Sequence, residues 1–135
     1  MKKPLKKILK QKQTKPKFLN FQITDNIYQK EIDIYVGDRV RSEQIIRKKY
    51  NLTSKDEIFP VTWGGGTLFL ETPDGDMAFI IWFSCPISSY IAHECMHATY
   101  YILHGLGLDL TDNTQEAYAY YMGFLCKEIY SHITK

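Results

Sequence analysis

The turn sequence PDGD at residues 73–76 constrains the fold of this chain most, because it separates two apolar runs. Residues 67–72 read TLFLET and residues 77–84 read MAFIIWFS. Proline, aspartate and glycine between two such runs are typical of a hairpin turn. We therefore predict paired strands at these positions, with 77–84 in the centre of the sheet because it is the most apolar. Residues 31–36 alternate aliphatic and polar side chains, which predicts a further, half-buried strand.

Three helices are predicted around these strands. The segment 42–51 reads as a short helix with Ser42 or Asp38 as its cap. Two longer helices follow the last strand, at 87–104 and 115–133. Strands followed by two long helices indicate an α+β fold. We expect a small, mostly antiparallel sheet packed on the helix 87–104 and on a C-terminal helix.

Charge divides the chain into two parts. Residues 1–17 contain eight lysines and no acidic residue, whereas the rest carries nine Lys and Arg against fifteen Asp and Glu. We interpret 1–17 as a basic tail and 18–135 as a single domain, since 135 residues is the size of one domain. The tail is a weak candidate for binding nucleic acid, because it lacks arginine and interleaved aromatic residues. A solvated extension is the alternative.

Composition also limits where the protein works. No window of the sequence approaches the ~18 uninterrupted apolar residues of a membrane span. The basic start lacks the apolar run of a secretory signal. Three cysteines without a CxxC pair favour reduced thiols over a disulfide framework. We therefore expect a soluble cytoplasmic protein.

The segment His93-Glu94-Cys95-Met96-His97 carries the clearest chemistry. It matches HExxH, in which two histidines four residues apart on a helix share one face and can bind one Zn²⁺ ion. The glutamate between them can act as the base for a metal-activated water. Two structural histidines with satisfied hydrogen bonds are the alternative interpretation.

A catalytic zinc needs a third protein ligand. His104 shares the stripe of the two histidines but lies far along the helix axis, and Asp109 and Asp112 fall in the following loop. Glu116 is the preferred candidate, because an antiparallel helix would return a residue of its first turn towards the motif. Eighteen residues separate it from His97.

These residues resemble the gluzincin class of zinc metallopeptidases, in which a glutamate on the next helix follows HExxH at a similar spacing. The phrase QEAYAYY is also similar to small phage- or prophage-borne zincins and, more loosely, to ImmA/IrrE-type metallopeptidases. The similarity covers residues 76–134. It implies a minimal zincin-like domain that hydrolyses a peptide or protein, with Zn²⁺ held by His93, His97 and Glu116 and with Glu94 as general base.

Other residues are candidates for the same expected site. Tyr120 follows Glu116 by one turn and is a candidate oxyanion donor, and Tyr90 and Tyr101 lie on or near the stripe of the histidines. After the glycines of WGGG at 63–66, we expect residues 67–71 to form the edge strand beside the cleft. The alternative is that these glycines make a bulge or a hairpin turn. Two other functions stay open. One is a non-catalytic, zinc-binding phage or prophage protein with a structural or regulatory role. The other is a regulator associated with nucleic acid.

Overall fold

A computed structural model describes residues 17–54 and 56–135 of the protein. Its sheet has the strand order β1-β2-β4-β3, formed by β1 (Leu19–Thr24), β2 (Glu31–Val36), β3 (Gly65–Glu71) and β4 (Met77–Phe83). β2 and β4 run parallel in the centre, whereas β1 and β3 are antiparallel edge strands. This arrangement confirms an α+β fold with a mostly antiparallel sheet and a central β4.

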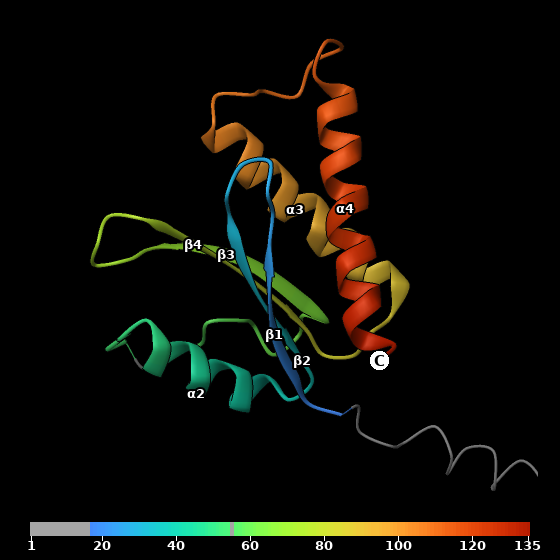
Figure 1. Ribbon diagram of the computed structural model, residues 1–135. Coiled ribbons are helices and arrows are strands. Elements are labelled where there is room, and N and C mark those ends of the chain that lie inside the picture. Colours follow the sequence, from blue (N-terminus) through green and yellow to red (C-terminus); the bar gives the residue numbers. More distant parts are fainter. Residues whose placement is uncertain (1–16, 55) are drawn as a thin grey trace, which may run out of the picture.

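Helices cover both faces of the sheet (Figure 1). The two long helices, α3 (Ser88–Gly105) and α4 (Gln115–Ile133), pack together on one face, as expected. The shorter α2 (Arg39–Lys49) covers the opposite face, a position that the sequence pattern leaves open. Asp38 is the cap of α2, since its Oδ1 accepts a hydrogen bond from the Arg41 amide at 3.0 Å.

Two apolar cores follow from the alternation along the strands. Ile32, Ile34 and Ile81 point into the core beneath α3 and α4. Tyr35 and Trp82 belong to the core beneath α2. Neighbouring residues of one strand thus serve opposite faces, as the pleat of a strand requires. Both central strands are therefore buried on both sides. Because β2 and β4 run parallel, α2 and α3, which follow them, start from the same end of the sheet.

The β3–β4 hairpin forms where the turn sequence predicts it. The Gly75 amide donates to the Thr72 carbonyl at 2.9 Å, and Gly75 has a φ of 84°. A positive φ of this size favours glycine, because a Cβ would clash with the backbone. The hairpin leaves β3 at the edge of the described sheet, directly beside α3.

Two expectations concern membranes and the tail. None of the helices in the described ranges combines the length and apolar character that crossing a bilayer requires. The predicted nucleic-acid contact falls on residues 1–17, of which 1–16 lie outside the described residues.

Candidate active site

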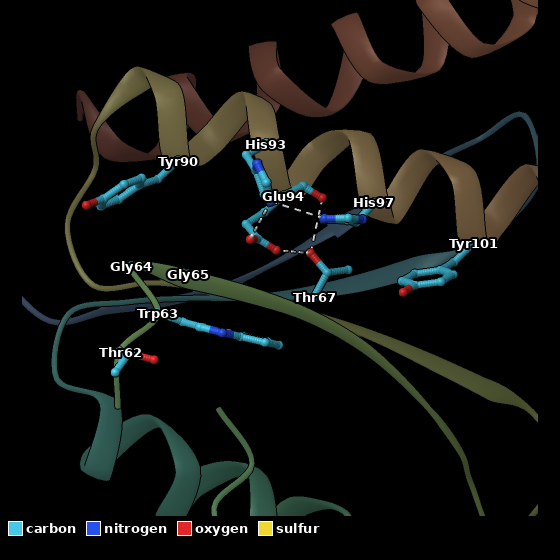
Figure 2. Close-up of a pocket in the computed structure, with 10 residues that line it drawn as sticks. All are labelled: Thr62, Trp63, Gly64, Gly65, Thr67, Tyr90, His93, Glu94, His97 and Tyr101. Atoms are coloured by element: carbon cyan, nitrogen blue, oxygen red, sulfur yellow. Dashed lines mark hydrogen bonds and ion pairs between the residues drawn. The ribbon is translucent and has the colours of Figure 1, made fainter. Parts of the chain in front are cut away.

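The two histidines of the motif converge in the structure. His93 and His97 lie one turn apart on α3, and their Nε2 atoms are 3.1 Å apart (Figure 2). Two imidazoles on one tetrahedral Zn²⁺ at about 2.05 Å would hold their nitrogens about 3.3 Å apart. The pair therefore has the separation that two ligands of a single ion need. A shared proton between the two rings would give the same distance.

The side chain of Glu94 reaches from α3 towards the sheet. Its residue is only 6% exposed, and its Oε2 lies 2.6 Å from Thr67 Oγ1 on β3. Its other oxygen, Oε1, lies 3.9 Å from His93 Nε2. The carboxylate is thus buried beneath the histidine pair, with Oε1 on the side of His93.

A pocket of about 460 Å³ opens between α3 and the start of β3. Its helical wall carries the motif together with Tyr90 and Tyr101. Its strand wall is formed by residues 62–65 and Thr67 (Figure 2). The prediction that both tyrosines lie near the stripe of the histidines is confirmed, since both line the pocket.

Glycines bring the strand wall close to the helix. A Cβ on Gly64 would lie 2.5 Å from the Tyr90 ring, and one on Gly65 would lie 3.1 Å from Glu94 Cγ. Neither position leaves room for a side chain. β3 is an edge strand of the described sheet, and its Gly65 and Thr67 line the pocket, so the expected cleft-edge strand at 67–71 is confirmed. Gly65 and Gly66 extend this strand, whereas Gly64 lies in the bend that precedes it.

Glu116 does not join the histidine pair in the structure. Among residues 17–54 and 56–135, no group of three His, Cys, Asp or Glu side chains is arranged to hold a metal ion. Glu116 is exposed and lies on the opposite side of α4 from the buried Tyr118 and Tyr121. The expected set of three ligands is therefore present only in part.

The contact between α3 and α4 shows where Glu116 lies along the helices. The thiols of Cys95 and Cys126 meet, and their hydrogen bond, followed by burial, raises the pKa of Cys95. Cys126 is therefore level with the motif. Glu116 precedes it by ten residues, which is about 15 Å along a helix axis. Figure 1 shows that a long connection carries the chain away from the end of α3 before α4 begins, and that α4 then crosses α3 at an angle.

The other candidates for third ligand are engaged elsewhere. His104 Nδ1 pairs with Asp109 Oδ1 at 2.7 Å, and Asp112 Oδ1 accepts from Gln115 Nε2 at 3.1 Å. Tyr120, the expected oxyanion donor, is 76% exposed and is not among the residues that line the pocket. The tyrosines available at the pocket are Tyr90 and Tyr101.

Sequence reasoning missed the contact between Thr67 and Glu94. These residues are 27 positions apart and meet only because β3 packs beside α3. The glycine run followed by a threonine was the available signal. Gly65 and Thr67 lie two residues apart and therefore share one face of the strand.

Comparisons of the chain with protein-family models, with curated proteins and with solved structures found no match.

Proposed function

We propose that this pocket is the active site of a metal-dependent hydrolase that cleaves a peptide or protein. The observation that carries the proposal is the pair of Nε2 atoms 3.1 Å apart, with the buried carboxylate of Glu94 beside them. The resemblance of the motif to gluzincins supports the same chemistry. We infer that His93 and His97 supply two ligands to a Zn²⁺ ion.

The side chains of the pocket supply part of a zinc site. The two imidazoles have the separation of paired ligands, whereas the described residues add no third side chain to form a complete group. A bound divalent cation at this position supplies Lewis-acid activation of the attacking water and of the scissile carbonyl. The contribution of the protein side chains is to hold that centre and to move protons around it.

Glu94 is the proposed general base. Thr67 occupies its Oε2, so that Oε1 remains on the side of His93. This oxygen can accept the proton of the attacking water and pass it to the leaving amine. Burial keeps the carboxylate away from bulk solvent, and the surrounding strand limits its rotation.

The shape of the pocket supports an extended peptide as substrate. Among the described residues, β3 pairs with β4 on one side only, so its other edge offers backbone groups to a further strand. Peptides bind such edges by strand addition, and glycines allow the two backbones to approach closely. The rings of Trp63, Tyr90 and Tyr101 form apolar walls for the side chains of the peptide.

The test combines metal content with peptide hydrolysis. The full chain, loaded with Zn²⁺, is assayed on an unfolded protein substrate and on a library of fluorescent peptides, alongside Glu94→Gln. We expect the variant to retain its metal and to lose about 10²–10⁴-fold in rate, the usual contribution of a general base. Glu128→Gln, which changes a carboxylate of α4 outside the pocket, is the matched control and should keep the wild-type rate.

Two results would overturn the proposal. Hydrolysis that is equal in the wild type and in Glu94→Gln would show that the pocket is not the source of the activity. Stoichiometric metal without hydrolysis of any substrate would instead favour the second function considered above, a zinc-binding protein of structural or regulatory role.

A further inference from the structure

We propose that Gly65 and Thr67 form a seat on β3 that fixes the carboxylate of Glu94, which makes Thr67 a positioning residue of this site. The catalytic consequence rests on the proposed function, whereas the seat itself is a contact that can be tested in the metal-free protein. Three features of the contact support the seat: the space it leaves, its hydrogen bond, and the separate surroundings of the two carboxylate oxygens.

Space for the glutamate comes from the glycine. Gly65 and Thr67 face α3 from the same side of β3, and the side chain of Glu94 lies over them (Figure 2). A Cβ on Gly65 would be 3.1 Å from Glu94 Cγ and 2.9 Å from the carbonyl oxygen of Trp82. The second of these atoms belongs to the backbone of β4 and cannot move aside. Any larger residue at position 65 would therefore displace the glutamate.

The hydrogen bond comes from the threonine. Thr67 Oγ1 lies 2.6 Å from Glu94 Oε2 and 3.1 Å from the backbone oxygen of the same residue. The hydroxyl has one proton, and the shorter distance assigns it to the carboxylate. The side chain of Glu94 is 8% exposed, and a carboxylate is costly to bury without such a donor. Hydrogen bonds to ionised acceptors are also the stronger class.

The seat gives the two carboxylate oxygens different tasks. Oε2 is held against β3 by Thr67, while Oε1 faces His93 Nε2 at 3.9 Å. Loss of the hydroxyl would free the side chain to rotate, and Oε1 would no longer stay beside the histidines. We therefore expect loss of this hydroxyl to lower kcat while KM changes little.

The first experiment measures the contact without activity. Unfolding of the metal-free protein by urea is compared for Thr67→Val, Glu94→Leu and the double variant. If the seat exists, Thr67→Val destabilises the wild type, because it leaves a buried carboxylate unpaired. The same change has a much smaller effect in the Glu94→Leu background, where no carboxylate is left to satisfy. Equal effects of Thr67→Val in the two backgrounds would overturn the proposal.

The second experiment measures the consequence for hydrolysis. Thr67→Val should lower kcat by about 10–100-fold, as loss of a supporting hydrogen bond does at metal sites, with KM and metal content little changed. Thr67→Ser keeps the hydroxyl and should restore most of the rate. The matched control is Thr72→Val, because the buried hydroxyl of Thr72 has no hydrogen-bond partner within the described ranges. It should leave kcat unchanged.

The two proposals can fail separately. A wild-type chain without hydrolytic activity removes the proposed function, while the unfolding comparison still decides whether the seat exists. An active wild type whose kcat survives Thr67→Val, or whose kcat Thr67→Ser does not restore, removes the positioning role and leaves the hydrolase assignment standing.

Discussion

One wall of the pocket is a stretch of a single helix, whereas the other wall is held by residues from distant parts of the chain. On α3, the spacing of four residues is enough to bring His93 and His97 together. The strand wall depends on Glu43 of α2. Its carboxylate accepts hydrogen bonds from the backbone amides of Ile58 and Phe59 at 3.0 and 2.8 Å. The difference separates chemistry that is encoded locally from chemistry that requires the whole fold.

A series of contacts links α2 to the strand wall. Glu43 fixes the backbone at Phe59, and the ring of Phe59 packs where a Cβ of Gly66 would otherwise lie. Directly before β3 begins, Ser84 Oγ donates to the carbonyl oxygen of Gly64 at 2.9 Å. The core beneath α2 thus supports a pocket that opens on the other side of the sheet.

The largest expected effect tests whether the local wall alone determines metal binding. His97→Ala should abolish stoichiometric Zn²⁺ binding, because it removes one of the two converging ligands. Glu116→Ala should leave the zinc content unchanged, since Glu116 lies about 15 Å along α4 from the level of the motif. Metal content of the purified proteins, measured by mass spectrometry, distinguishes the two.

The matched control for this pair is His104→Ala, which removes a histidine of α3 that is paired with Asp109. It should bind zinc like the wild type. Loss of zinc in Glu116→Ala would show that the metal-bound protein brings the first turn of α4 to the histidines, contrary to the arrangement described above.

This comparison also explains how much the sequence could predict. Periodicity and turn residues were enough to predict the β3–β4 hairpin, the two long helices and the shared face of the histidines. Each of these features is determined by residues that are close together in the sequence. The position of Glu116 is not decided locally. It depends on how far α3 continues beyond His97 and on the path of residues 106–114. Together they place the first turn of α4 too far from the histidines.

The contact of Thr67 with Glu94 was out of reach for the same reason. It joins a strand to a helix across 27 residues, and the glycine run followed by a threonine does not indicate which helical residue it meets. The glycines gave only half of the answer, since a glycine run is equally compatible with a turn. What decides between the two interpretations is the packing of Tyr90, Glu94 and Phe59 against positions 64–66.

The next prediction weakens the strand wall from α2. Glu43→Gln should lower the free energy of unfolding by about 3 kcal/mol, because the buried carboxylate accepts from two amides and pairs with Arg39 and Arg47. Urea unfolding measures the change. Glu57→Gln, at an exposed neighbouring position, should stay within about 0.5 kcal/mol of the wild type. Equal stability of the two variants would mean that Glu43 does not anchor this segment.

A smaller effect is expected from crowding the same wall. A Cβ on Gly66 would lie 2.3 Å from the Phe59 ring, so Gly66→Ala should destabilise the protein by about 1–3 kcal/mol, as overpacking does. Gly123→Ala on α4 is the opposite case, because its Cβ would meet nothing within 4 Å. It should raise stability by about 0.5–1 kcal/mol through helix propensity. Thermal unfolding of both variants checks the difference in sign.

The smallest effect at neutral pH concerns Tyr35, which packs with Phe59 in the core beneath the strand wall. Its buried hydroxyl has no hydrogen-bond partner in the part of the chain that the structure describes. Tyr35→Phe should therefore change the free energy of unfolding at pH 7 by less than about 1 kcal/mol, or stabilise the protein. Tyr121→Phe is the contrast, because the Tyr121 hydroxyl donates to Asp25 Oδ2 at 2.7 Å and its loss should cost about 1–3 kcal/mol.

Tyr35 also makes the free energy of unfolding depend on pH. Burial, and then the nearby Asp33 carboxylate, raise the pKa of Tyr35 from 10 to about 12. The unfolded chain loses this proton near pH 10, so the contribution of the neutral hydroxyl is fully present below pH 10 and is lost as the pH rises through about 12. Urea unfolding of the wild type should weaken over this range, and Tyr35→Phe should weaken less. Identical pH profiles would show that Tyr35 titrates alike in the folded and unfolded chains, and that this core admits water beneath the pocket.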